Sequence, residues 1–394
     1  MFNSLRRRAT AEGIPVYLVG GPVRDAVLDV PANDLDFVLI GDAPALAAEL
    51  AEELGGNVTI HPRFRTATVE IEGDRVDVVT ARKETYQFPG SLPKVSASGL
   101  EDDLARRDFS INAMAVPLAG DNPEVIDHHG GLNDVTAKVI RTLHPVSFAD
   151  DPTRIFRAVR YGERLGFQID RDSLPDLKEA IAAGYVDAVS GDRLRHEFEK
   201  IFEELHAARM LLRAIELGAL AAVHPALSDG QALTRLIGGN GTGTGPNDYL
   251  AALVFSSLAS DGDAVSRRLN LPADWSRLVR DTIALRESEA LLSAPSVRAS
   301  AVYQTLNGLD TDAIAASVRL SQNPEVAVLL RRFLDEWRLV TPILTGDDLL
   351  AMGVPSGVNI GEILRELHSA KLDGLVGSVD AERALVDQII MRGS

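Results

Sequence analysis

The first third of the chain alternates between short apolar runs and longer stretches with apolar residues at helical spacing. Short apolar runs predict buried strands. They occupy 14–20, 35–40, 66–71 and 75–80. The last two flank Gly73-Asp74, a turn dipeptide that predicts a hairpin. The stretches 22–28 and 44–54 each open with proline and predict helices between the strands.

The pattern changes near residue 152, where strand-like runs give way to apolar residues repeated every three or four positions. This spacing predicts amphipathic helices. They occupy 152–165, 193–205, 208–217, 249–257 and 326–340, and two or three short helices are expected within 345–394. The glycine-rich stretch 237–248 has no strand before it, so it predicts a surface loop rather than a phosphate cradle. We therefore expect an α+β head followed by an all-helical remainder.

Length and composition indicate a globular protein of two or three domains. The chain has 394 residues, 45% of them hydrophobic, and no cysteine. A chain without cysteine has no disulfide partner, thiolate zinc site or cysteine nucleophile. No apolar run reaches the length of a membrane span, and the basic residues near the start are not followed by the apolar segment of a secretory signal. We expect a cytoplasmic protein with no membrane partner.

The formal net charge is −17. Non-specific binding to polyanions depends on many Lys and Arg side chains that release counterions, so the charge argues against that class of protein. It does not exclude an enzyme that reads one RNA end by shape, a few arginines and a metal ion.

Two carboxylates open the second predicted strand. Asp34 and Asp36 are two residues apart, so their side chains project from the same face. Neighbouring carboxylates suit Mg²⁺, which binds oxygen ligands together with substrate phosphates, although a solvated strand start would give the same pattern. Asp77 is the lone acidic residue of a later apolar strand and is the best candidate for a third catalytic carboxylate.

A pair of glycines ends the first predicted strand. Gly20 and Gly21 allow a phosphate to approach the backbone at the start of a helix, and Arg24 lies one turn further on. The stretch is not a Walker A loop, because the Gly-Lys-Ser/Thr ending is missing. Phosphate-holding glycines followed by a metal-binding Asp34 and Asp36 are the arrangement that two-metal nucleotidyl transfer requires.

A cluster of charges at 101–108 precedes an apolar run. Its last two members, Arg107 and Asp108, are suited to hold a sugar or a phosphate. A salt-bridged helix face is the alternative interpretation.

Seven stretches resemble, in their order, the motifs of class II tRNA nucleotidyltransferases, the family of CCA-adding enzymes and bacterial poly(A) polymerases. They are LVGGPVRD (18–25), DLDFV (34–38), VDVVTARKETY (76–86), EDDLARRDFSINAMA (101–115), IDHHGGLNDV (126–135), DDPTRIFRAVRYGERLGF (150–167) and GDRLRHEFEKIF (191–202). The resemblance implies a polymerase-β-like nucleotidyltransferase head with a mixed sheet, followed by helical regions. The implied regions are a head at 1–145, a base-selecting neck at 146–205, and a body at 206–340 and a tail at 341–394 that bind tRNA.

The resemblance also implies roles for single residues. Asp34 and Asp36 would hold the metal ions, and Gly21 and Arg24 would hold the triphosphate. Arg107 and Asp108 would contact the ribose side of the nucleotide.

The segment 150–154 matches the motif with which the family selects the nucleotide, except that Asp150 stands where the family usually has Glu. Asp151 and Arg154 share one helix face. A carboxylate accepts from the exocyclic amine of cytosine or adenine, and a guanidinium donates to the ring nitrogen. Guanine and uracil present the opposite pattern and would leave buried groups unpaired. Arg157 is expected to approach the base or the phosphates, and Arg160 is either a second such residue or structural.

The expected activity is template-independent addition of C and A, from CTP and ATP, to the 3′ end of tRNA with Mg²⁺ as cofactor. Alternatives within the family are CC-only addition, A-only addition and poly(A) synthesis, and an alternative outside it is an RNA-binding protein with an inactive head. The Pro/Gly/Ser-rich segment 87–99 predicts a mobile loop.

Overall fold

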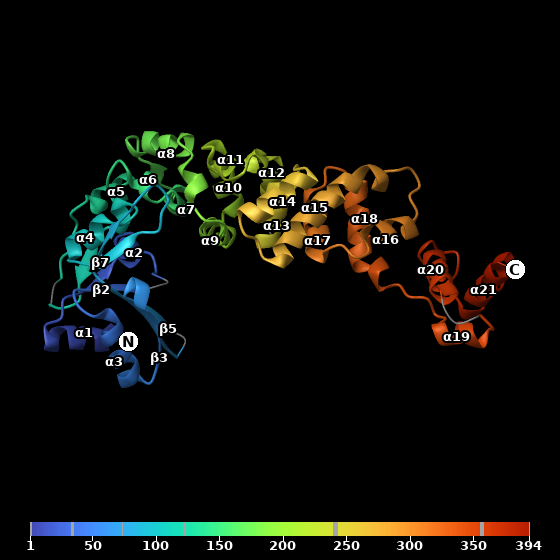
Figure 1. The fold of residues 1–394 in the computed structure, drawn as a ribbon, viewed down its shortest axis with the longest axis horizontal. Helices are drawn as coiled ribbons and strands as arrows, with labels where there is room; N and C mark the ends of the chain where they lie inside the picture. Colours follow the sequence, from blue (N-terminus) through green and yellow to red (C-terminus); the bar gives the residue numbers. More distant parts are fainter. Residues whose placement is uncertain are drawn as a thin grey trace. The chain divides into compact units, whose positions relative to one another are not determined.

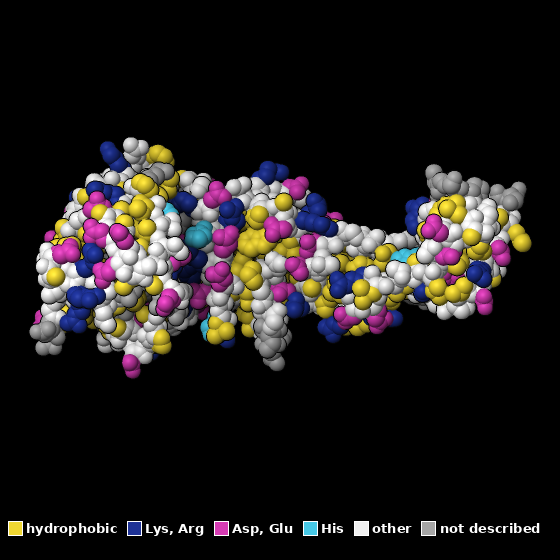
Figure 2. Space-filling view, turned by 90° about the horizontal axis from the view of Figure 1, so that it is seen from below, with side chains coloured by type: hydrophobic (Ala, Val, Ile, Leu, Met, Phe, Trp, Pro, Cys, Tyr) yellow, Lys and Arg dark blue, Asp and Glu magenta, His cyan; other side chains and the backbone are white. Residues whose placement is uncertain are grey.

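The computed structural model describes residues 2–32, 35–72, 74–120, 123–238, 243–354 and 358–393. It divides into two compact units, shown as a ribbon in Figure 1. Unit 1 comprises Met1–His206 and Glu216–Val223, and unit 2 comprises Ala207–Ile215 and His224–Ser394. Figure 2 shows acidic and basic side chains interspersed over the viewed face of each unit, so neither sign of charge gathers in one region there.

Unit 1 is built on a six-stranded mixed sheet with the strand order β3-β4-β5-β2-β1-β8. The strands are β1 (Val16–Val19), β2 (Leu35–Leu39), β3 (Asn57–His61), β4 (Thr66–Ile71), β5 (Asp74–Thr80) and β8 (Ala115–Pro117). Strands β2 and β5 run parallel, whereas the other neighbours are antiparallel. The mixed sheet and the antiparallel β4–β5 pair confirm the predictions for this region.

One face of the sheet is covered by α1 (Phe2–Glu12) and α3 (Ala43–Leu54), which place apolar side chains against the strands (Figure 1). Phe37 of β2 and Leu50 of α3 are fully buried there. Helix α3 is bounded by Asp42, whose carboxylate accepts from the Ala45 amide, and by Gly55 in the left-handed conformation.

The other face has an apolar part and a polar part. Near β1 and β8, α4 (Leu100–Ala105) contributes Leu104 to a cluster with Val19 and Val38. On β3, β4 and β5 the same face carries polar side chains, because successive residues of a strand alternate between faces. This polar part belongs to the site described below.

The rest of unit 1 consists of short elements. They are α2 (Gly21–Val27), η1 (Pro62–Phe64), β6 (Arg82–Thr85), β7 (Lys94–Ala97), η2 (Ser110–Asn112), α5 (Gly131–Ala137), β9 (Val139–Ile140), α6 (Ser147–Asp150), α7 (Thr153–Leu165), β10 (Gln168–Ile169), α8 (Ser173–Ala182), η3 (Tyr185–Ala188), α9 (Gly191–Phe202) and α11 (Ala219–Val223).

Two predictions for unit 1 need correction. The loop expected at 87–99 is shorter, because residues 94–97 form β7 and pair with β6. The region expected to be all-helical contains β10, a two-residue strand that pairs with β9 and is too short to leave a pattern in the sequence.

The regular elements of unit 2 are all helices within its described residues, which confirms the prediction for this part of the chain. Its helices are α10 (Ala207–Glu216), η4 (Pro225–Ser228), α12 (Gln231–Gly238), α13 (Pro246–Val254), α14 (Ala259–Arg268), α15 (Ala273–Leu292), α16 (Ala299–Leu306), α17 (Thr311–Leu320), α18 (Pro324–Asp335), η5 (Trp337–Leu339), α19 (Gly346–Ala351), α20 (Val358–Leu372) and α21 (Val379–Gly393). The loop predicted at 237–248 is shorter, because residues 237–238 belong to α12 and residues 246–248 to α13; residues 239–242 lie outside the described part of the chain. No described helix is long and apolar enough to span a membrane.

Candidate active site

Two carboxylates lie side by side in a cavity of about 620 Å³ in unit 1. Asp36 of β2 is in register with Asp77 of the parallel strand β5, so both side chains project from the same face of the sheet. The Thr68 hydroxyl on β4 donates to Asp77 Oδ1 at 2.6 Å, and Arg75 Nη2 lies 3.6 Å from Asp77 Oδ2. We call Asp36 and Asp77 the acidic pair.

The acidic pair fits a divalent metal ion. Adjacent carboxylates repel each other unless a cation lies between them, and Mg²⁺ takes carboxylate oxygens together with substrate phosphates. Among the described residues, no group of three or more His, Asp and Glu side chains forms a metal cluster. Asp34, the other predicted ligand, lies outside the described residues.

The glycine turn after β1 is shaped by the side chain that covers it. Gly20 has a φ of 76°, a conformation that favours glycine, and a Cβ there would lie 2.7 Å from Arg107 Nη1, so a side chain at this position would displace the Arg107 guanidinium. Gly21 begins α2 and lines the cavity.

Arg24 does not line the cavity. It is buried, its Nη1 donates to Asn112 Oδ1 at 2.6 Å, and its Nε donates to Asp25 Oδ1 at 2.9 Å. Its Nη2 lies 3.7 Å from where a Cβ of Gly21 would be, so the guanidinium packs beneath the turn. The predicted contact of Arg24 with a triphosphate stays a prediction.

Asp103 orients two arginines at the edge of the cavity. It is fully buried, and it accepts from Arg106 Nη2 at 2.7 Å and from Arg107 Nη2 at 3.1 Å. Burial would raise the pKa of Asp103, but the two guanidinium groups lower it, so the carboxyl is held ionised. The salt-bridged arrangement considered for the 101–108 cluster is thus present, and it leaves Arg106 and Arg107 in the cavity lining.

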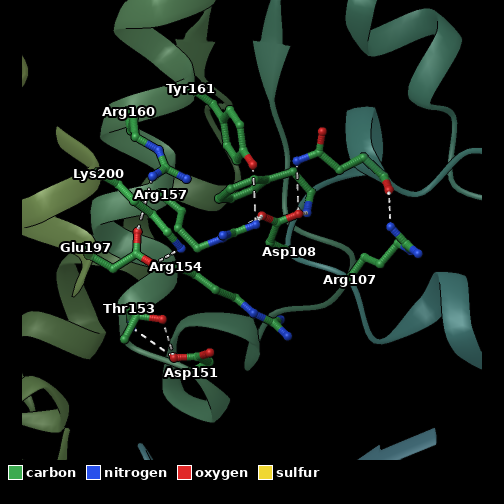
Figure 3. A network of polar contacts seen from close by, with 12 residues as sticks. Arg107, Asp108, Asp151, Thr153, Arg154, Arg157, Arg160, Tyr161, Glu197 and Lys200 are labelled. Carbon is green, nitrogen blue, oxygen red and sulfur yellow. Dashed lines mark hydrogen bonds and ion pairs between the residues drawn. The ribbon is translucent and has the colours of Figure 1, made fainter. Parts of the chain in front are cut away.

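The buried Asp108 forms an ion pair with the partly buried Arg157 (Figure 3). The Nε and Nη2 of Arg157 donate to Asp108 Oδ2 at 2.8 and 2.5 Å, and Asn112 Nδ2 donates to Oδ1 at 3.1 Å. Burial would raise the pKa of Asp108, but the charge and hydrogen bonds of Arg157, with that of Asn112, lower it to about 2. Both residues line the cavity.

The Tyr161 ring lies beneath three arginines. The guanidinium carbons of Arg24, Arg157 and Arg160 are 5.3, 5.5 and 5.4 Å from its centroid, within the range of cation–π attraction. Tyr161, which lies on α7, thereby connects this helix to Arg24 beneath the glycine turn.

Asp151 and Arg154 stand at the start of α7, and both line the cavity. Asp151 Oδ1 accepts from the amide and hydroxyl of Thr153 at 3.0 and 2.7 Å. Arg154 is buried, and it donates from Nη1 to Ser147 Oγ at 2.5 Å and from Nη2 to the Arg106 carbonyl at 2.8 Å.

Asp150 is not among those partners of Arg154. Its carboxylate lies 4.0 Å from His144 Nε2. Arg154 is therefore held by Ser147 and by the Arg106 carbonyl, and not by Asp150, the residue that differs from the family's usual Glu.

Arg193 connects Asp151 to the β6–β7 hairpin. Its Nη2 donates to Asp151 Oδ1 at 2.7 Å and its Nη1 donates to the Gly90 carbonyl at 2.9 Å. The Gly90 amide in turn donates to the Ala149 carbonyl at 3.1 Å. The hairpin tip is thus tied to the segment that carries the candidate base-reading residues.

Arg160 and Glu197 form a second buried pair beside the cavity. Arg160 Nη1 lies 3.9 Å from Glu197 Oε2, and within the described part of the chain Arg160 Nε and Glu197 Oε2 have no hydrogen-bond partner. Arg160 does not line the cavity, whereas Glu197 does.

Sequence reasoning assigned no role to Asp103, Tyr161, Arg193 or Glu197. Asp103 had a signal, since it lies three and four residues before the arginines that it orients. Arg193 and Glu197 lie in the quoted stretch 191–202, and their contacts join distant segments, which spacing alone does not predict.

Two family models match the chain. The "Poly A polymerase head domain" matches residues 16–141, and the "Probable RNA and SrmB- binding site of polymerase A" matches residues 166–230. The first match contains the sheet and the acidic pair.

Named relatives match along the chain. An A-adding tRNA nucleotidyltransferase of Halalkalibacterium halodurans is 31% identical over 95% of this chain and 89% of its own length. A CC-adding tRNA nucleotidyltransferase of Deinococcus radiodurans is 32% identical over 97% and 91%. An A-adding tRNA nucleotidyltransferase of Geobacter sulfurreducens is 33% identical over 94% of this chain, which spans 44% of that relative's length.

Solved structures agree with these matches. An apo form of a CCA-adding enzyme has a TM-score of 0.83 at 29% identity, covering 99% of this chain and 95% of the other. The Thermotoga maritima CCA-adding enzyme complexed with tRNA has a TM-score of 0.76 at 29% identity, covering 98% and 94%. With two relatives matched over nearly their whole length and a head model lying on the sheet that carries the acidic pair, the chain belongs to the tRNA nucleotidyltransferase family.

Proposed function

We propose that this protein adds C and A, from CTP and ATP, to the 3′ end of tRNA and releases pyrophosphate. The observation that carries the proposal is a single cavity lined both by the acidic pair and by Asp151 and Arg154. One group of residues serves nucleotidyl transfer, and the other presents a fixed hydrogen-bonding pattern to a base.

Asp151 and Arg154 select the base. Asp151 Oδ2 is the carboxylate oxygen left to accept from the exocyclic amine of cytosine or adenine, because Oδ1 is taken by Thr153 and Arg193. Arg154 donates to the ring nitrogen beside that amine. Ser147 and the Arg106 carbonyl hold the guanidinium in place. The ring N–H of guanine or uracil would therefore face an Arg154 donor, and its carbonyl oxygen would face the Asp151 carboxylate.

The other residues hold the sugar and phosphates. Gly20 and Gly21 let the triphosphate approach the backbone, with Arg24 beneath the turn, while Arg107, Asp108 and Arg157 position the ribose side. Asp36, Asp77 and Asp34 would hold Mg²⁺, which when bound activates the attacking hydroxyl and neutralises charge on the leaving pyrophosphate. The hydrogen bonds to Asp103 and Asp108 direct Arg107 and Arg157 at the cavity.

The predicted regions complete the proposal. Residues 1–145 form the catalytic head and 146–205 the neck, and 206–340 and 341–394 form the body and tail that bind tRNA in the cytoplasm. Two narrower activities are the alternatives: addition of A alone and addition of CC alone. Each is supported by one relative, since one is named an A-adding and the other a CC-adding enzyme.

Incubation with Mg²⁺, tRNA lacking its 3′-terminal CCA and single labelled nucleotides tests the proposal. CTP incorporation on that tRNA and ATP incorporation on tRNA ending in CC are expected together. CTP incorporation alone would select CC addition, and ATP incorporation alone would select A addition. Incorporation of neither would overturn the proposal and favour an RNA-binding protein without transfer activity.

A further inference from the structure

The cavity continues beyond the acidic pair, onto the polar part of the sheet. There it is lined by four side chains that we call the polar strip: His61, Thr66, Thr68 and Arg75. His61 is in register with Thr66 across β3 and β4, and Thr68 is in register with Asp77 across β4 and β5. Because paired residues share a face and alternate residues return to it, the polar strip and the acidic pair project from the same face.

The strand order places three members of the polar strip and the glycine turn on opposite sides of the acidic pair, while Arg75 lies on β5 itself, two residues before Asp77. The acidic pair lies on β5 and β2, in the middle of the sheet. Gly20 and Gly21 follow β1, on one side of these strands, whereas His61, Thr66 and Thr68 lie on β3 and β4, on the other side.

This arrangement indicates from which side of the acidic pair the attacking hydroxyl enters. In an in-line displacement the attacking oxygen enters opposite the leaving group. With the triphosphate at the glycine turn, as in the proposed function on which this inference rests, the leaving pyrophosphate lies on the β1 side. The attacking 3′-hydroxyl therefore enters from the β4 side, and the phosphodiester of the same nucleotide lies one sugar away from it.

We propose that the polar strip binds the terminal phosphodiester of the RNA acceptor, with Arg75 supplying the positive charge. The Arg75 side chain is 60% exposed, and its pairing with Asp77 at 3.6 Å is of the exposed kind that contributes little free energy. A phosphate can therefore take the Arg75 donors without a large loss. The Thr66 hydroxyl and the exposed His61 add donors that suit phosphate oxygens and read no base, whereas Thr68 donates its hydroxyl proton to Asp77.

The strip also has a boundary. Glu70 is in register with Arg75 across β4 and β5, so negative charge limits the strip at that end. A surface that holds a phosphate without reading a base suits an acceptor whose last nucleotide changes as the product grows.

The test combines Arg75→Gln with an RNA acceptor whose terminal internucleotide linkage is a neutral methylphosphonate. For the unaltered enzyme we expect the neutral linkage to raise the KM for RNA about 10-fold. Arg75→Gln should raise the KM for ordinary RNA by about the same factor and respond less than about twofold to the neutral linkage. The KM for CTP or ATP and the kcat at saturating RNA should change less than about twofold.

Arg171→Gln is the matched control, since it removes an exposed arginine of unit 1 that does not line the cavity. Fluorescence anisotropy with EDTA reports acceptor affinity without metal or turnover, and Arg75→Gln should weaken it while Arg171→Gln should not. An unchanged KM for RNA in Arg75→Gln, or equal responses of both enzymes to the neutral linkage, would overturn the inference. Nucleotide incorporation by the unaltered enzyme in the same experiment separates these outcomes from a failure of the proposed function.

Discussion

Two groups of charged side chains in the lining of the cavity differ in burial and in partners. The first group, which we call the neck side, comprises Arg154 and Arg157 of α7 and their partners; in it Asp108 and Arg154 are 7% and 5% exposed, and each is hydrogen-bonded to other protein groups. On the polar strip, Arg75 is exposed, and its pairing with Asp77 is longer. A fixed, desolvated pattern discriminates between bases, since a mismatched ligand leaves buried groups unpaired. An exposed strip holds charge without discriminating.

The acidic pair would hold the metal ion, so its removal should have the largest effect. Asp36→Asn keeps the shape of the side chain and removes its charge, and we expect kcat to fall about 10³-fold or more. Affinity for tRNA should stay within about twofold, because the grip on the tRNA does not depend on this carboxylate. Glu52→Gln, an exposed carboxylate of α3, is the control. Retained activity in Asp36→Asn would show that the metal assignment is wrong.

The stability of the neck side should depend on its buried ion pair. Asp108→Asn leaves the partly buried Arg157 beside a neutral group, and we expect the free energy of unfolding to fall by about 2 kcal/mol. On the polar strip, Arg75→Gln should change it by less than about 0.5 kcal/mol. Urea unfolding at neutral pH measures both, and equal effects would remove the contrast between the two sides.

The same comparison has a pH dependence with a defined sign. The pKa of Asp108 is lowered to about 2, so its stabilising contribution is present above the ordinary carboxyl pKa of about 4 and is lost as pH falls toward 2. The difference between the unaltered protein and Asp108→Asn should therefore shrink below about pH 4. A difference that stays constant down to pH 2 would contradict the pairing.

Base discrimination should depend on the neck side alone. Arg154→Gln replaces a donor-only group by an amide that both donates and accepts, so discrimination of CTP and ATP against GTP and UTP should relax by about 10- to 100-fold. The ratio of kcat/KM values measures this, and Arg75→Gln should leave the ratio unchanged. Unchanged discrimination in Arg154→Gln would defeat the base-reading argument.

The smallest effect is expected at Arg193, a positioning residue that acts through Asp151. Arg193→Gln should raise the KM for CTP and ATP about fivefold without changing the KM for RNA, and Arg193→Lys should restore part of the loss. Arg195→Gln, on the same helix with partners Asp192 and Glu199, is the control. A rise in the KM for RNA instead would show that Arg193 acts on RNA binding and not on nucleotide binding, which would contradict this assignment.

Local pattern was enough to single out several residues that line the cavity. Asp36 and Asp77 stand out as acids within apolar strands, and Asp151 and Arg154 are three residues apart at the junction of α6 and α7. The strands β2 and β5 were also visible, because buried strands leave apolar runs.

Other parts depend on contacts between distant segments. Arg193 meets Asp151 across 42 positions of sequence, and Arg24 meets Asn112 across 88. Strands β3 and β6 escaped prediction because their side chains are largely polar and exposed, so pairing rather than burial makes them strands. Tyr161 gives no sequence signal for its place beneath three arginines.

The parallel pairing of β2 with β5 has a consequence for how the protein is made. A parallel pair cannot close through a tight turn, and here α3, β3 and β4 lie between the two strands in sequence. On a ribosome, a nascent chain that has not yet released residue 80 cannot set Asp36 beside Asp77. The growing chain therefore has no assembled catalytic centre until most of its sheet is ready to fold.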